Sequence, residues 1–176
     1  MNSDKDEIWC EHCHKHWKMS TLGELSAVEG RTEFSHIPDW FEFQRANVRK
    51  QVEDGSYFFM DEVMVDSLPN AKGYIRLGTA TLTHSSDGFT LSKFSGDESF
   101  TMEKKALSLY SLHIEFDYFG KGDCIDLSTQ DDTFYLYPLT RKNVVTKLQF
   151  AVEEIYKLKE KERSAGRATK AAPVSI

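Results

Sequence analysis

The fold is decided by residues 73–94, which read Gly73-Tyr-Ile-Arg-Leu-Gly-Thr-Ala-Thr-Leu-Thr-His84, Ser85-Ser-Asp-Gly88 and Phe89-Thr-Leu-Ser-Lys-Phe94. The first and last parts follow the two-residue period of β-strands. Between them lies Asp87-Gly88, and an Asp-Gly pair readily supplies the positive φ that a tight hairpin needs. The stretch therefore predicts a β-hairpin.

The same period continues on both sides of this hairpin. We expect further strands at residues 57–66, 98–104, 107–118, 123–128 and 133–137. After Pro138 the period becomes helical, and the helix should run to about residue 161 with one apolar face, made of Val145, Leu148, Val152, Ile155 and Tyr156. The predicted fold is α+β, mainly β. A pleckstrin-homology-like antiparallel barrel of about seven strands, capped by its C-terminal helix, would occupy residues 55–160, although other small barrels share this pattern.

The N-terminal part has a different organisation. Residues 1–7 are polar and are expected to be disordered. Residues 8–36 contain Cys10-x-x-Cys13 and several turn residues, which predicts a zinc-ribbon-like knuckle and hairpin. A connecting helix is expected over residues 37–54. At the other end of the chain, residues 161–176 lack apolar periodicity and are expected to form a disordered tail.

Cys10 and Cys13 have the spacing of a zinc knuckle, but no second Cys-x-x-Cys follows them. Structural zinc takes four tetrahedral ligands. The expected cofactor is therefore structural Zn²⁺, and its predicted ligands are Cys10, Cys13, His16 and His36. Two alternatives stay open. One is a degenerate ribbon without metal, held by Trp9, Trp17 and Leu25, and the other is a redox Cys-x-x-Cys, which normally opens a helix after a strand.

Composition excludes several classes of protein. The formal net charge of −6 argues against nucleic-acid binding, which relies on a basic surface. Three cysteines do not make a disulfide framework, and the polar N-terminus does not resemble a signal peptide. No apolar run approaches the roughly 20 residues of a membrane span. We expect a cytoplasmic protein, with peripheral attachment to the membrane as a further hypothesis.

The sequence contains no assembled catalytic motif. His84 and His113 are interpreted as a turn residue and a solvated strand residue, and Cys124 as a core residue. The acidic and aromatic run from Glu115 to Asp123 is interpreted as a turn between strands rather than a catalytic pair. Basic residues that could bind a phosphate headgroup on one rim of the barrel are Lys93, Lys104, Lys105, Lys121 and Arg141, although the negative net charge counts against such a site.

Four stretches together carry a resemblance that spans residues 8–160. They are Trp9-Cys-Glu-His-Cys-His-Lys-His-Trp-Lys-Met19 with Leu22-Gly-Glu-Leu25, Phe34-Ser-His-Ile-Pro-Asp-Trp-Phe41 through Lys50, Gly78-Thr-Ala-Thr-Leu-Thr-His84 with Gly88-Phe89, and Asp123-Cys-Ile-Asp-Leu127 with Thr146-Lys-Leu and Glu153-Glu-Ile-Tyr156. With these features the chain resembles the C-terminal accessory region of bacterial 1-acyl-sn-glycerol-3-phosphate acyltransferase-like proteins.

The resemblance implies a role without catalysis. The acyltransferase domain of such proteins uses His-x-x-x-x-Asp, and none of the six histidines here is followed by Asp at that spacing. We therefore expect a non-catalytic accessory or binding domain of a phospholipid acyltransferase-type protein. Alternative functions are a pleckstrin-homology-type module that binds a lipid or phosphate headgroup, and a protein-interaction or homodimerisation module. The expected partners are an acyltransferase domain, a lipid membrane surface or a second copy of the chain, and not nucleic acid.

Overall fold

The computed structural model describes residues 2–11, 13–69, 73–130 and 132–171, and the chain divides into two units, Met1–Asn47 and Val48–Ile176. The fold is α+β and mainly β, with one antiparallel sheet in each unit. The helix predicted over residues 37–54 is α1 (Ile37–Glu53), which begins in the first unit and ends in the second.

The N-terminal unit is built on a four-stranded sheet in the order β1-β2-β3-β4. Its strands are β1 (Asn2–Asp4), β2 (Glu7–Trp9), β3 (His16–Met19) and β4 (Leu25–Ala27). Trp17 and Leu25 are buried, and the rings of Trp17 and Trp40 lie 4.7 Å apart. The prediction of disorder at residues 1–7 is wrong for β1, because an edge strand can pair its backbone with β2 without burying apolar side chains.

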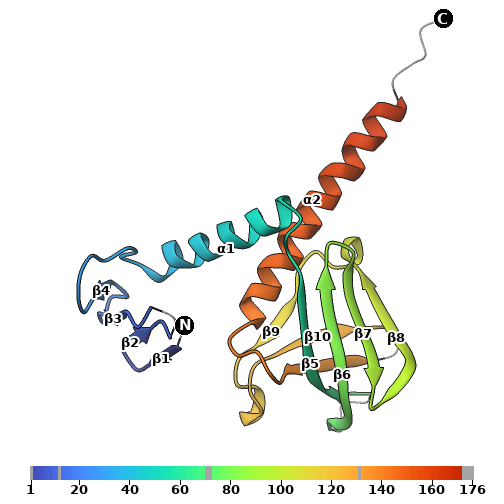
Figure 1. The fold of residues 1–176 in the computed structure, drawn as a ribbon, viewed down its shortest axis with the longest axis horizontal. Helices are drawn as coiled ribbons and strands as arrows, with labels where there is room; N and C mark the ends of the chain where they lie inside the picture. Colours follow the sequence, from blue (N-terminus) through green and yellow to red (C-terminus); the bar gives the residue numbers. More distant parts are fainter. Residues whose placement is uncertain (1, 12, 70–72, 131, 172–176) are drawn as a thin grey trace, which may run out of the picture. The chain divides into compact units, whose positions relative to one another are not determined.

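The second unit contains a seven-stranded antiparallel sheet in the order β8-β7-β6-β5-β11-β10-β9 (Figure 1). Two meanders, β5 to β8 and β9 to β11, meet where β5 pairs with β11. The strands are β5 (Phe59–Ser67), β6 (Ile75–Ser85), β7 (Gly88–Phe94), β8 (Asp97–Lys105), β9 (His113–Glu115), β10 (Cys124–Ser128) and β11 (Thr133–Pro138).

The hairpin predicted from Asp87-Gly88 is confirmed. Strands β6 and β7 pair in antiparallel register up to Ser85 and Gly88, and Gly88 has φ +119°. A Cβ on Gly88 would lie 2.1 Å from the carbonyl oxygen of Lys104, so only glycine fits at this point of the sheet. The hairpin therefore depends on Gly88 both for its backbone angle and for the close approach of β8.

The core lies between one face of the sheet and helix α2 (Val145–Ala171). Leu148, Val152 and Ile155 are buried as predicted, and Phe150, which does not belong to the predicted apolar face, is also buried. The last turns of α1 contact α2 on another side, since Arg49 Nε donates to Glu154 Oε2 at 2.7 Å. A helix contacted on more than one side buries more than a single stripe of residues.

The closed barrel predicted for residues 55–160 is not formed among the described residues, because β8 and β9 remain the two edges of the sheet. A side chain bridges part of the gap instead, where Lys104 Nζ donates to Ser128 O at 2.7 Å. The strand predicted over residues 107–118 is mostly wrong. Short 3₁₀ turns at Ala106–Ser108 (η1) and Tyr118–Gly120 (η2) leave only β9 between them, too short to pair along β8.

Helix α2 continues to Ala171, so the prediction of a disordered tail is wrong for residues 161–171, and residues 172–176 lie outside the described residues. Its last turns extend past the sheet (Figure 1). Residues with high helix propensity and ion pairs one turn apart, such as Arg163–Glu160 at 2.7 Å, support this extension. No helix in the described part of the chain is long and apolar enough to cross a membrane.

Candidate functional site

The four predicted zinc ligands do not come together in the N-terminal unit. Cys10 and Cys13 lie in the turn between β2 and β3, where the amide of His14 donates to Cys10 O at 2.8 Å. His16 pairs with Trp9 across the β2–β3 ladder, and His36 forms a separate bridge with Glu24. Among the described residues, which exclude His12, no group of three or more His, Cys, Asp or Glu side chains is placed to hold a metal ion.

The zinc prediction can be tested by elemental analysis of protein purified without added metal. Structural zinc requires four ligands around one point, so the predicted site would need His16 and His36 to approach the two cysteines. One zinc per chain that is lost in Cys10→Ser is the result expected for the predicted site. Equal, less than stoichiometric zinc in the natural chain and in Cys10→Ser would contradict the prediction.

A second cluster of polar and aromatic side chains lies on the face of the sheet opposite the core. Cys124, Tyr137 and Asp66 are buried there, although their strand neighbours Ile125, Leu136 and Val65 already face the core. They are covered by residues 116–122, here called the aromatic loop, which connects β9 to β10. The ring of Tyr118 in this loop stacks on Tyr135 of β11, with centroids 5.5 Å apart.

The aromatic loop is tied to the sheet by an ionic cluster around Asp66. Asp66 is only 1% exposed, and it accepts hydrogen bonds from Arg76 Nε and Lys121 Nζ, each at 2.8 Å. Burial raises the pKa of the Asp66 carboxyl, but the hydrogen bonds from Arg76 and Lys121 outweigh it, so its pKa lies below the ordinary value. A buried carboxylate on β5 thus holds a loop that is distant in sequence.

Tyrosine side chains complete the contact between the loop and the sheet. The hydroxyls of Tyr74 and Tyr118 are 2.5 Å apart, and the ammonium group of Lys121 lies 5.1 Å from the Tyr74 ring centroid. The hydrogen bond to Tyr74, together with burial, raises the pKa of Tyr118 to about 12. These contacts hold the loop through rings and hydroxyls that stay protonated near neutral pH.

The backbone of the aromatic loop is strained. Asp117 and Phe119 have φ values of 43° and 52°, in the left-handed region that residues other than glycine seldom adopt. The carboxylate of Asp123 accepts a hydrogen bond from the Asp117 amide at 3.1 Å and closes the base of the loop. The result is that Phe116 and Phe119 are 64% and 73% exposed. Strain of this kind concentrates at ligand clamps and binding loops.

The buried groups beneath the loop are poor catalysts. Burial raises the pKa of the Cys124 thiol to about 12, so this cysteine is a protonated thiol and a weak nucleophile. Burial likewise raises the pKa of the Tyr137 hydroxyl well above its usual range. The arrangement is suited to holding an exposed aromatic surface in place.

Lys121→Met tests the anchoring of the aromatic loop. The variant keeps most of the side-chain length but leaves buried Asp66 with one cation fewer, so we expect the free energy of unfolding to fall by about 1–2 kcal/mol. The amide of Tyr118, which donates to Gly122 O, should exchange faster with solvent. Denaturant unfolding and hydrogen exchange measure the two effects. Lys93→Met is the matched control, because Lys93 only approaches exposed Glu98 at 3.7 Å. Equal effects of the two variants would contradict the anchoring role.

A groove of about 300 Å³ lies on the other side of the loop base. Its walls are Gly122, Asp123, residues 138–139 and residues 141–145, including exposed Leu139, Arg141 and Lys142. The carboxylate of buried Asp61 accepts hydrogen bonds from the amides of Thr140 and Arg141, which positions this segment beside the loop. The groove therefore places two basic residues next to apolar surface.

The other predicted headgroup ligands are dispersed over the sheet. Lys121 binds Asp66, and Lys93 lies beside Glu98 on the β7–β8 hairpin. Lys104 and Lys105 lie together at the end of β8, and Arg141 follows β11. These five residues thus do not form the single basic rim that the sequence suggested.

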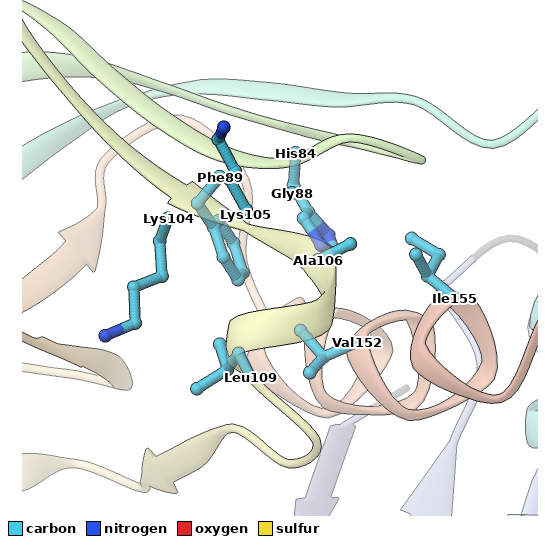
Figure 2. A pocket seen from close by; sticks show the side chains of 9 residues that line it. All are labelled: His84, Gly88, Phe89, Lys104, Lys105, Ala106, Leu109, Val152 and Ile155. Atoms are coloured by element: carbon cyan, nitrogen blue, oxygen red, sulfur yellow. The ribbon is translucent and has the colours of Figure 1, made fainter. Parts of the chain in front are cut away.

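His84 is buried in a separate place, between the β6–β7 hairpin and α2. Its Nδ1 lies 2.9 Å from the hydroxyl of Tyr57, and its ring stacks on Phe89 at 3.9 Å. Burial lowers the pKa of His84 to about 3, so the imidazole is neutral at physiological pH. The adjoining cavity of about 10 Å³ has room for no more than one water molecule, and Figure 2 shows Val152 and Ile155 of α2 on its wall. His84 is a structural residue and not the turn residue that was predicted.

The acidic and aromatic run from Glu115 to Asp123 is recognisable in the sequence and was interpreted as a turn between strands. That interpretation did not identify Phe116 and Phe119 as exposed side chains. The available signal was two phenylalanines in a polar, glycine-containing loop, where burial cannot explain them. No protein-family model matches the chain, and no curated protein matches it. The resemblance to an acyltransferase accessory region therefore stays a prediction.

Proposed function

We propose that this chain is a non-catalytic binding module that accompanies a phospholipid acyltransferase-type protein, and that the aromatic loop is its contact surface. The observation that carries the proposal is the exposure of Phe116 and Phe119 on a strained loop that Asp66, Lys121 and the tyrosines hold in position. Aromatic side chains presented on a preorganised loop are typical anchors of protein interfaces.

Charge supports a protein partner with a basic surface. Glu115, Asp117 and Asp123 lie close to the two phenylalanines in sequence, while the cation of Lys121 is engaged by Asp66. These acidic residues disfavour insertion of the two phenylalanines themselves into an anionic membrane. An enzyme that acts on an anionic lipid is expected to carry basic surface near its substrate, which an acidic module could contact. The acyltransferase domain implied by the resemblance is thus the partner we propose.

The experiment is a binding assay between this chain and the acyltransferase domain of a protein of the type it resembles. We expect the double variant Phe116→Ser, Phe119→Ser to weaken binding by about tenfold or more. Phe58→Ser is the matched control, because Phe58 is 59% exposed just before β5, away from the loop in sequence, and it should change binding little. No binding by the natural chain, or equal loss in both variants, would refute the contact surface.

The non-catalytic part of the proposal has its own test. The chain alone, supplied with lysophosphatidate and an acyl donor, should form no phosphatidate. Turnover that scales with protein concentration and survives repurification would overturn this part and leave the contact surface to the binding assay.

The groove beside the loop supports a second candidate function, binding of a phosphate headgroup by a pleckstrin-homology-type module. Arg141 and Lys142 are exposed there beside Leu139, so an anionic lipid could meet both charge and apolar surface. Cosedimentation with phosphatidate-containing vesicles at low salt tests it, with neutral phosphatidylcholine vesicles for comparison. Arg141→Gln with Lys142→Gln should abolish binding, and Lys93→Gln should not. Absence of cosedimentation by the natural chain would rule this candidate out.

A further inference from the structure

Strand β8 is a long edge of the sheet. It pairs with β7 on one side, and no strand in the described ranges pairs with its other side. At its start the carboxylate of Asp97 accepts a hydrogen bond from the Ser99 amide at 2.9 Å. The remaining residues present a row of backbone donors and acceptors, which is a template for another strand.

The nine residues of β8 are complementary to themselves. The strand begins with two acidic residues, Asp97 and Glu98, and ends with two basic residues, Lys104 and Lys105. Thr101 stands at its centre, flanked by Phe100 and Met102. An antiparallel partner with the same sequence therefore brings acidic ends to basic ends.

We propose that β8 pairs with β8 of a second copy of this chain, antiparallel, with Thr101 of each copy on the two-fold axis. An isologous contact of this kind uses the same residues on both copies and closes on itself. The pairs across the axis would be Asp97 with Lys105, Glu98 with Lys104, Ser99 with Glu103, Phe100 with Met102, and Thr101 with Thr101. In the single chain Lys104 donates to Ser128 O and Glu98 lies 3.7 Å from Lys93, so the Glu98–Lys104 pair forms only by exchanging those two contacts. Opposite charges and apolar residues that face each other in this way stabilise a sheet.

The neighbouring registers are worse. An axis at Phe100 places Asp97 opposite Glu103, which sets like charges against each other. An axis at Met102 places Lys104 opposite Phe100 and leaves Asp97 and Glu98 without a basic partner in the strand. The charge pattern therefore selects the Thr101 register.

The side chains of β8 are suited to this pairing. Phe100 and Met102 are half-buried against the core, and the ring of Phe100 lies 5.2 Å from that of Phe94. A second copy would cover their remaining exposed edges. Thr101, Glu103 and Lys105 are exposed on the opposite face, where cross-strand pairs can form without moving the core.

The dimer does not depend on the proposed function. In the strand order, β8 is at one end of the sheet and β9, which leads into the aromatic loop, is at the other. A variant that abolishes self-association should therefore leave binding through Phe116 and Phe119 intact, and the loss of one activity can be distinguished from the loss of the other.

Charge reversal tests the register. Lys105→Glu sets Asp97 opposite a glutamate, and Asp97→Lys sets Lys105 opposite a lysine, twice per dimer in each case. Asp97 and Lys105 are both exposed, whereas Lys104 already donates to Ser128 O. Sedimentation equilibrium should show a dimer for the natural chain and about tenfold weaker self-association for either variant. An equimolar mixture of the two variants should recover the dimer, because each reversed charge then faces its opposite. Circular dichroism of each variant verifies the fold.

A cross-link locates the axis. Thr101→Cys should form a disulfide between copies, which mass spectrometry of the peptides can assign in the presence of the natural cysteines. Glu103→Cys is the matched control, because its two copies would lie four residues apart along the strands, about 13 Å, too far for a disulfide. A monomer at the highest attainable concentration would overturn the proposal. So would a dimer that both reversals leave unchanged and that Thr101→Cys does not cross-link.

Discussion

Gly88→Ala is expected to lower the free energy of unfolding by about 4 kcal/mol or more, the largest effect of any single methyl group that we foresee. The new Cβ would lie 2.1 Å from Lys104 O and 2.7 Å from Ala106 N, and both are backbone atoms that cannot move without shifting β8. The φ of +119° at Gly88 adds conformational strain. Denaturant unfolding followed by circular dichroism measures the loss.

Two other glycines separate the causes of this effect. Gly96 has φ +86° but open space around its Cβ position, so Gly96→Ala should cost only the strain, about 1–2 kcal/mol. Gly166 lies in α2 with open space, and Gly166→Ala should add about 0.5–1 kcal/mol of stability. A cost at Gly88 no greater than that at Gly96 would show that β7 and β8 do not approach as closely as described.

Stability should fall by about 2 kcal/mol between pH 7 and pH 5 because of His84 alone. Burial holds the pKa of His84 at about 3, whereas the same residue in the unfolded chain has a pKa near 6.5. As the pH falls below 6.5, the unfolded chain gains a proton that the folded chain does not bind, so the equilibrium moves toward unfolding. The stabilisation of the folded chain that neutral His84 provides is fully present above pH 6.5. It is lost progressively as the pH falls from 6.5 to about 3.

Denaturant unfolding at several pH values between 7 and 5 measures this dependence. His84→Gln should remove most of the dependence of the unfolding free energy on pH in this range. The variant also loses stability at pH 7, because the contacts of His84 with Tyr57 and Phe89 change. His113→Gln is the matched control, because His113 is exposed and its loss should leave the slope due to His84 in place. An unchanged slope in His84→Gln would show that His84 titrates normally in the folded chain.

Most secondary structure of the second unit follows from local pattern. Hairpin β6–β7 forms where Asp87-Gly88 interrupts two alternating runs, and α2 begins near the predicted position. The pattern failed over residues 107–118, where Leu112 and Ile114 do face inward but Asp117 takes a left-handed backbone and turns Phe116 to solvent. The side-chain period contains no information about that change of direction.

The candidate sites, too, could be predicted from the sequence only in part. Cys10 and Cys13 were found by their spacing, and the turn that carries them exists, but four ligands around a metal require His16 and His36 to approach as well. The aromatic loop was predicted as a turn between strands, and it is the connection between β9 and β10. Its anchor could not be recognised, because Asp66 and Lys121 look like ordinary surface charges in the sequence.

The sequence by itself determined the local hairpins, the apolar stripe of α2 and the self-complementary charges of β8, because each depends on residues a few positions apart. Only the tertiary structure decided that β5 pairs with β11, that Phe150 is buried, and that Lys121 reaches Asp66 across 55 positions of the chain. The physical reason is that such contacts form only when separately formed meanders and a helix pack around one core. The burial of Asp66 and the exposure of Phe119 are properties of that packing and not of either residue's neighbours in the chain.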